Sequence, residues 1–328
     1  MQFGVGLHPE LGADAVSREA QQADALGYDS VWLYDHLMNW AGVQTAEFPL
    51  ETLTLAAAVG AVTSHVRLSW GVLNLGFYNP AVFAKALATL DQITHGRVIC
   101  SAGSGWFKEE AEAYNLPMIQ DHDERSAAAY EAVTLIKELW AHPAPETTTF
   151  TGKHFRTRNL PFQPAPYQAG GPPIWIGGES EVTLRLVRDQ ASGWVLLGST
   201  PLDAVRRVVT GPDWPSSPMT VVRTCRIVVA PTRSEVLDAA RVTYEIRRKA
   251  REAQIEQPGH PLAPMISFEE FIEREIVGTP EECMARISEL EEYGINYIRL
   301  AYDDPAQMEA VANLLLPRYA ESRELAPA

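Results

Sequence analysis

The chain has 328 residues, of which 46% are hydrophobic and 21% are charged, an ordinary composition for a folded globular protein. Its formal net charge of −15 argues against non-specific binding to nucleic acid or to an anionic membrane, because such binding needs basic patches. No apolar run approaches the roughly 20 residues of a membrane span, and the first residues lack the pattern of a signal peptide, so we expect a cytoplasmic protein.

Short apolar runs alternate with helical patterns along the whole chain. The first strand is expected at 2–8, and the helix after it at 14–26, where apolar residues recur at spacings of four, three and three. Asp14 is the expected N-cap of that helix and Gly27 its stop. Further strands are expected at 29–34, 66–73, 98–102, 173–176, 194–197, 219–229 and 296–301, and further helices at 50–63, 80–94, 124–140, 180–190, 201–209, 234–254, 280–293 and 306–320.

This order of elements predicts an α/β fold. Strands separated by helices pair in parallel through right-handed crossovers, and about eight such units match the (β/α)₈ TIM barrel. A doubly wound open sheet is the alternative, although it usually has fewer strands. Two Pro-rich stretches, about 142–172 and 255–278, are too long for simple connections, so we interpret them as insertions in a single domain covering 1–328.

The active site of such a barrel lies where the strands end at their carboxyl side. Asp35 and His36 follow the second strand, and histidine is a natural proton donor or acceptor near neutral pH. The alternative is that Asp35 caps a turn and His36 satisfies a loop hydrogen bond. Aromatic residues of these loops, including Trp40 and Trp106, would form either a pocket for a planar ligand or ordinary rim packing.

Glycines mark two further strand ends. Gly177 and Gly178 stand where a strand turns into a helix, so exposed N–H groups there would either bind a phosphate or form a tight turn without a ligand. Gly103 and Gly105 begin like a dinucleotide fingerprint, but Lys108 replaces the third glycine, which argues against a Rossmann site. Three widely spaced cysteines and the absence of a GxSxG motif predict no disulfide framework, no metal site and no serine nucleophile.

Four blocks of the sequence together resemble a known family. The blocks are GYDSVWLYDHLMNW (27–40), FYNPAVFAKALATLDQITHGRVICSAGSGW (77–106), PPIWIGGESEVTLRLV (172–187) and IVGTPEECMARISELEEYGINYIRL (276–300). They look like the corresponding segments of luciferase-like monooxygenases and their deazaflavin-dependent relatives. The resemblance covers most of the chain, whereas the segment from about 205 to 275 is uninformative.

The resemblance implies a bacterial luciferase-like TIM barrel that binds a flavin or deazaflavin at the carboxyl ends of its strands. In such proteins the third strand often ends in a non-prolyl cis peptide behind the ring. That bond would join Gly71 and Val72 here, with Asn74 beside the ring. Gly177 and Gly178 match the turn that holds the cofactor phosphate.

The pattern Asp35-His36-x-x-x-Trp40 looks like the active-site loop of deazaflavin-dependent sugar-phosphate dehydrogenases, in which the His and Trp flank the hydride-transfer site. His36 and Trp40 are therefore the expected catalytic residues, and Asp35, Gly105 and Trp106 complete the expected cofactor site. Trp106 stands where those dehydrogenases have a glutamate. This chain therefore lacks the acidic group that those dehydrogenases have at this position, which favours a more apolar substrate.

Three hypotheses follow. The leading one is an oxidoreductase that moves a hydride between the deazaflavin F420 and a small organic substrate, although the net charge does not favour a polyglutamylated cofactor tail. The second is a monooxygenase that uses reduced FMN and dioxygen, with a flavin reductase as partner. The third is a barrel that has lost catalysis. By resemblance alone we expect a homodimer.

Overall fold

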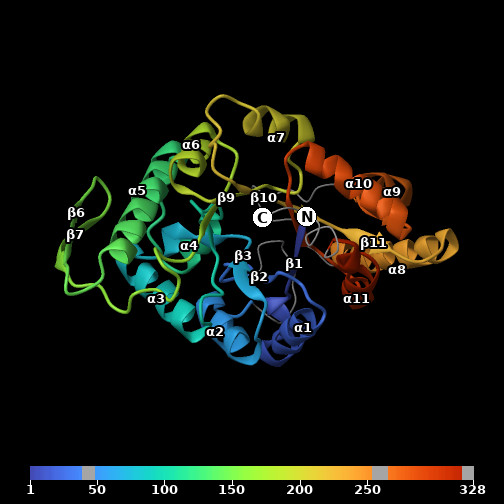
Figure 1. Ribbon diagram of the computed structural model, residues 1–328, viewed down its shortest axis with the longest axis horizontal. Coiled ribbons are helices and arrows are strands. Elements are labelled where there is room, and N and C mark those ends of the chain that lie inside the picture. The colour runs from blue at the N-terminus through green and yellow to red at the C-terminus, as the bar shows by residue number, and fades with distance from the viewer. Residues whose placement is uncertain (39–48, 253–264, 320–328) are drawn as a thin grey trace.

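The computed structural model describes residues 1–38, 49–252 and 265–319. In Figure 1 a group of strands lies at the centre and a ring of helices surrounds it. The central strands are all parallel, in the order β3-β2-β1-β13-β10-β9-β8-β5-β4. Their bounds are β1 (Gln2–Gly6), β2 (Ser30–Leu33), β3 (Arg67–Trp70), β4 (Leu73–Asn74), β5 (Cys100–Gly103), β8 (Ile174–Gly177), β9 (Gly193–Val195), β10 (Thr220–Cys225) and β13 (Tyr297–Leu300).

The sheet is a nearly closed barrel. β3 and β4, the two ends of the strand order, are separated in the chain only by Gly71 and Val72, so they are two halves of one interrupted strand. A parallel bridge between Leu68 and Val98 also links β3 to the segment that enters β5. Counting β3 and β4 as one, the expected TIM barrel is confirmed and the open sheet is wrong.

The helices of the ring bury their apolar faces against the outer side of the barrel. Prolines in the first turn begin three of these helices, where a missing N–H costs nothing. Asp121 caps another by accepting a hydrogen bond from the N–H of Glu124. The helices are α1 (Ala13–Ala25), α2 (Thr52–Val62), α3 (Pro80–Ile93), α5 (His122–Ala141), α6 (Glu181–Gln190), α7 (Leu202–Val209), α10 (Pro280–Glu292) and α11 (Pro305–Leu314).

The structure corrects several expected elements. The strand expected over 219–229 is two strands, because β11 (Ile227–Val229) leaves the barrel and pairs with β12 (Ile276–Gly278). Arg226 stands at the break, where its Nε lies 2.7 Å from Asp303. The N-cap of α1 is Gly12, and Asp14 lies in the first turn instead.

The two expected insertions contain regular structure. The first carries an antiparallel hairpin of β6 (Thr148–Thr151) and β7 (Arg156–Leu160), which stands at one edge of the molecule in Figure 1. The second lies partly outside the described residues, and its described part forms α9 (Phe268–Arg274) and β12. α9 and β12 pack against the long helix α8 (Arg233–Glu252).

The sequence analysis did not predict three short helical pieces. They are the 3₁₀ helices η1 (Pro9–Leu11) and η2 (Leu75–Phe77) and the helix α4 (Lys108–Ala113). In the described ranges, no helix combines the length and the apolar character needed to cross a membrane. Among the same residues, no group of His, Cys, Asp and Glu side chains is arranged to hold a metal ion.

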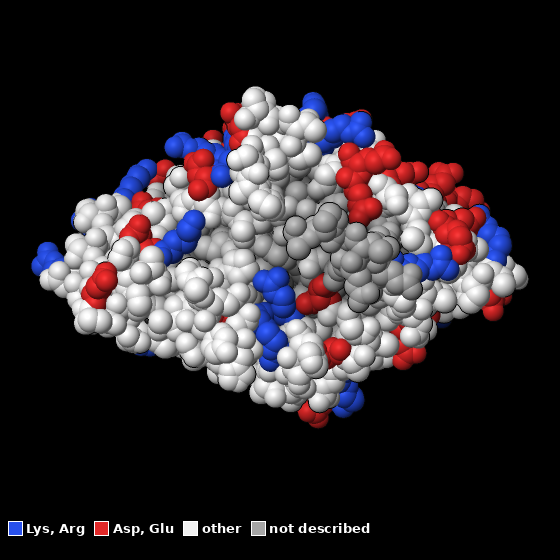
Figure 2. Space-filling model, viewed as in Figure 1, with Lys and Arg blue, Asp and Glu red and all other residues white. Residues whose placement is uncertain are grey.

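The inside of the barrel is filled unevenly. Its middle is a buried cluster of large side chains, with Trp175 in contact with both Trp32 and Tyr297 at ring separations of 5.8 and 5.4 Å. Two residues further along β8 the inward position is Gly177, beyond this cluster on the carboxyl side. The barrel is therefore plugged in its middle and lightly filled at the end where an active site is expected. Figure 2 shows the molecule in the same view as Figure 1, with a hollow near the centre of the face.

Candidate active site at the carboxyl end of the barrel

Glycines form the floor of the site. Gly71, Gly103 and Gly177 lie at neighbouring strand ends, and Val72 fills the space above the last two. A Cβ atom on Gly103 or on Gly177 would come within 2.9 Å of a Val72 methyl group. Side chains larger than hydrogen therefore do not fit beneath Val72, and the floor stays flat enough for a planar molecule to approach the backbone.

The peptide bond between Gly71 and Val72 is cis. This is the position at which the resemblance places a non-prolyl cis bond. The bond separates β3 from β4 and turns the Val72 side chain toward Gly103 and Gly177.

Asp35 holds the loops around this floor together. Its buried carboxyl accepts hydrogen bonds from the backbone N–H of Asn74 at 2.8 Å and from the hydroxyl of Tyr78 at 3.0 Å. Burial raises the pKa of Asp35 to about 7, outweighing these two hydrogen bonds, which favour the charged form. Asp35 therefore lies beneath the site surface, where it fixes the position of Asn74.

A buried glutamate positions His36. Oε2 of Glu110 lies 3.1 Å from Nδ1 of His36, and Oε1 accepts hydrogen bonds from the N–H groups of Leu37 and Met38 at 2.6 and 3.0 Å. Glu110 is fully buried on α4. A single carboxyl group thus orients the imidazole and the backbone that follows it.

Glu110 is the site residue that the sequence analysis missed. The replacement of a glutamate by Trp106 was expected to remove the acid from this region, but Glu110, four residues later, places a carboxyl group beside His36. α4 has only six residues, too few for a periodic pattern to reveal it. The signal that could have found it is the acid-rich KEEAEA segment directly after the strand-end glycines.

Trp106 lies beside His36. Their rings meet edge to face at 5.8 Å, and Trp106 also stacks on Phe107 at 5.1 Å. Gly105 has a positive φ of 81°, and a Cβ there would lie 2.2 Å from the Asn74 side-chain oxygen, so this glycine allows Asn74 to pack against the backbone.

Gly177 and Gly178 end β8, and α6 begins three residues later. Gly178 has a φ of 130°, a conformation that side chains rarely adopt, and its carbonyl accepts a hydrogen bond from the indole of Trp194. Ser180 caps α6 by accepting from the N–H of Thr183. The turn is thus a fixed loop that leads into a helix N-terminus, the arrangement expected for a phosphate site.

The structure brings nine of the ten expected site residues to one end of the barrel. These are Asp35, His36, Gly71, Val72, Asn74, Gly105, Trp106, Gly177 and Gly178. Trp40 lies outside the described residues.

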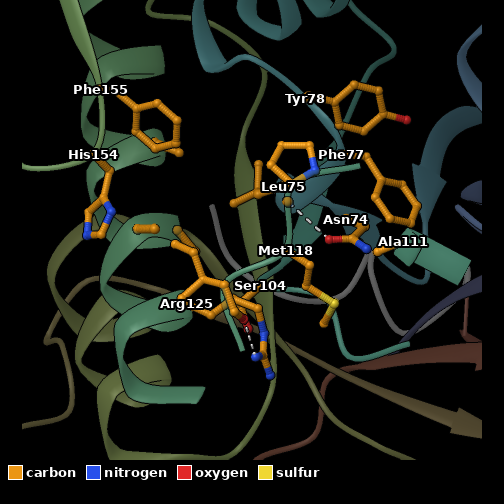
Figure 3. Close-up of a pocket in the computed structure, with 16 residues that line it drawn as sticks. Asn74, Leu75, Phe77, Tyr78, Ser104, Ala111, Met118, Arg125, His154 and Phe155 are labelled. Carbon is orange, nitrogen blue, oxygen red and sulfur yellow. Dashed lines mark hydrogen bonds between the residues drawn. The ribbon is translucent and has the colours of Figure 1, made fainter. Parts of the chain in front are cut away.

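A cavity of about 200 Å³ adjoins the site (Figure 3). Asn74 and Ser104 line it on the barrel side, and Phe155, from the turn between β6 and β7, lines it on the outer side. Its walls are largely apolar, with Met118 at one wall and Arg125 as the charged residue drawn there. The guanidinium of Arg125 donates to the carbonyls of Gly105 and of the 119–120 segment, so it holds the walls together.

Comparison with curated proteins finds relatives with two different cofactors. The chain is 31% identical over 203 residues to an FMNH₂-dependent dimethylsulfone monooxygenase of Pseudomonas fluorescens, covering 61% of this chain and 52% of the relative. It is 32% identical over 197 residues to an F420-dependent hydroxymycolic acid dehydrogenase of Mycobacterium tuberculosis, covering 58% and 52%. These matches span about half the length of the curated relatives.

Solved structures share the fold at lower sequence identity. An F420-dependent secondary alcohol dehydrogenase in complex with an F420–acetone adduct superimposes with a TM-score of 0.75 and 18% identity, over 96% of this chain and 98% of that one. The family model described as luciferase-like monooxygenase matches residues 1–297. The chain belongs to the luciferase-like monooxygenase family.

Proposed function

We propose that the protein is an F420-dependent oxidoreductase, which transfers a hydride between the deazaflavin and a small organic substrate. The observation that carries this proposal is the pair of His36 and the buried Glu110 beside the glycine floor. The F420-dependent dehydrogenase among its relatives supports the same activity.

The residues at the barrel end fit a ring cofactor. Gly71 and Val72 would lie beneath the ring and Asn74 beside it, while the turn at Gly177 and Gly178 would receive the phosphate. The flat floor supports this arrangement, since a Cβ at Gly177 would take the space of Val72. When bound there, the deazaflavin would supply or accept the hydride.

His36 would move the proton that accompanies the hydride. Its Nδ1 faces Glu110, so proton exchange with a substrate would run through Nε2. Glu110 would keep the ring in that orientation. Trp106 would form one wall of the substrate space.

The adjoining cavity indicates the kind of substrate. It is large enough for a short aliphatic or alicyclic group, and most of its lining is apolar. A substrate with one oxidisable or reducible oxygen near His36 and an apolar group directed past Asn74 fits this shape.

The second candidate function is an FMN-dependent monooxygenase on the same floor. The dimethylsulfone monooxygenase relative favours it, because that protein is FMNH₂-dependent. This function would require dioxygen and a partner flavin reductase. In either case we expect a cytoplasmic homodimer that acts on a small molecule.

A side-by-side titration separates the candidates. Purified protein is titrated with F420 and with FMN, each oxidised and reduced, and binding is followed by cofactor fluorescence and tryptophan quenching. Tight binding of F420 alone supports hydride transfer. Tight binding of reduced FMN alone contradicts it, and binding of neither cofactor would leave a barrel without redox function.

A further inference from the structure

One arginine inside the barrel has no partner among the described residues. Arg299 lies on β13 and its side chain reaches the layer of the glycine floor, where a Cβ on Gly71 would lie 2.3 Å from its Nη1. A Cβ on Gly6 would lie 3.5 Å from its Nη2. The guanidinium therefore lies between β1 and the cis peptide, at the edge of the proposed cofactor site.

The guanidinium makes no hydrogen bond or ion pair within the described part of the chain. Its Nε is closed off from solvent and has no acceptor, although the residue as a whole keeps some accessible surface. The ring of Trp32 lies 5.8 Å below and is the nearest compensation. A buried cation without an acceptor costs free energy, so this position is costly unless a ligand supplies the missing partner.

Arg299 keeps its charge under ordinary conditions. Burial, together with the smaller effect of the nearby positive charge of Arg226, lowers the pKa of Arg299 to about 10. The side chain is thus still protonated at neutral pH. Arg226 pairs with Asp303 at 2.7 Å and with Glu275 at 3.7 Å, so those two acids are already engaged.

We propose that Arg299 binds the electron-rich edge of the cofactor ring from within the barrel and favours its reduced state. This proposal rests on the proposed function, because it needs a ring on the glycine floor. A hydride carries two electrons and one proton, so a molecule that accepts it from a substrate, which is thereby oxidised, gains one negative charge. Arg299 would lower the free energy of that charged form more than the free energy of the oxidised form.

The test compares two arginines inside the same barrel. Arg299→Met removes the cation at the carboxyl end. Arg67→Met removes one from β3 near the opposite end, where Arg67 interacts with Asp29 and Tyr297. Dissociation constants of oxidised and chemically reduced F420, with FMN as a second probe, are measured for both variants and the wild type.

We expect Arg299→Met to weaken binding of the reduced cofactor at least about tenfold more than binding of the oxidised one. That ratio equals a fall of about 30 mV in the two-electron potential of the bound cofactor, which equilibration with a redox dye measures independently. Arg67→Met should leave the ratio unchanged. Arg299→Lys, which keeps the charge, should restore most of it.

Each outcome bears on the proposal. Equal weakening of both redox states, or the same ratio in both Met variants, would mean that Arg299 serves only the packing of the barrel. If Arg299→Met does not fold, Arg299→Gln compared with Arg299→Lys decides the same question. Wild-type protein that binds neither cofactor would refute the proposed function and this inference with it, whereas binding without a redox-selective loss refutes the inference alone.

Discussion

The middle of the barrel and its carboxyl end are built from the same strands but are filled in opposite ways. In the middle, Trp32, Trp175 and Tyr297 occupy inward positions and exclude solvent. Two residues further along β8, the inward position is Gly177, which has no side chain. Along β13 the corresponding position is Arg299, which has no hydrogen-bond partner among the residues that the structure describes. One alternation of inward residues thus supplies both a plug that stabilises the fold and a floor that a planar ligand can reach.

The largest effect is expected from a substitution at His36, which removes a proposed catalytic group at the carboxyl end and leaves the buried aromatic plug unchanged. His36→Ala should lower turnover of an organic substrate by roughly 10²- to 10⁴-fold, because the proton donor or acceptor is lost. Affinity for the cofactor should change little, which equilibrium titration checks. His65→Ala is the matched control, since that histidine is 86% exposed and its ring pairs with Asp24. Unchanged turnover in His36→Ala would remove His36 from the mechanism.

A substitution in the plug should have the reverse effect. Trp175→Ala leaves a cavity between Trp32 and Tyr297 and should lower the free energy of unfolding by about 3–5 kcal/mol, measured by urea denaturation. Cofactor affinity of the folded protein should not change. Trp106→Ala, at a side chain that is 48% exposed, should cost less than about 1 kcal/mol. A plug variant that loses cofactor binding while remaining folded would contradict the division between the two regions.

Because of Asp35, the free energy of unfolding should depend on pH. Its pKa is raised to about 7 in the folded protein, so the native state holds a proton that the unfolded chain releases near pH 4. The free energy of unfolding should therefore fall by up to about 4 kcal/mol as the pH rises from 4 to 7, and then level off. Asp35→Asn should remove that decline, as urea denaturation across this pH range would show.

Asp24 is the control, because its pKa is shifted in the opposite direction to that of Asp35. Burial would raise its pKa, but the backbone N–H groups of Ser64, Val66 and His65 outweigh burial and lower it. Asp24→Asn should therefore lower the stability in full above the unfolded pKa, near pH 4, and this loss should disappear as the pH falls through the lowered folded-state pKa. If Asp35→Asn and the wild type show the same pH dependence, Asp35 is ionised in the native protein at pH 7 and below.

The smallest effect is expected from a substitution in the glycine floor, measured as a change in cofactor affinity. Gly177→Ala places a Cβ 2.9 Å from Val72, so Val72 must shift toward the space for the ring. We expect about a tenfold loss of cofactor affinity, in line with the usual cost of overpacking. Gly198→Ala is the control, because its nearest atom lies at 3.6 Å. Equal affinity in both variants would show that the floor does not bear the ring.

Local signals in the sequence predicted the barrel and the placement of most candidate site residues at the ends of its strands. Each βα unit has its own periodic helix and apolar strand, so Asp35, His36 and the glycines could be assigned to strand ends before their neighbours were known. Contacts between distant segments were not predictable in this way. Glu110 reaches His36 across 74 residues from a six-residue helix, and nothing in either segment indicates that contact.

The sequence analysis also did not predict the role of Arg299 or the break after β10. The segment YIRL was correctly assigned to a strand, and its one charged residue shares the inward face with Tyr297. A charge at an inward position of a barrel strand is a signal that could have marked Arg299. At the split between β10 and β11, Arg226 contacts Asp303 and Glu275. This long-range arrangement cannot be read from an apolar run over 219–229.

In the proposed complex, the glycine floor holds the ring of a deazaflavin. The most direct test is a crystal structure of the protein with F420. We predict the ring against Gly71 and Val72, its edge beside Arg299, and its phosphate at the turn of Gly177 and Gly178. F420 bound elsewhere, or a floor that stays closed by Val72 while F420 saturates the protein, would contradict the account.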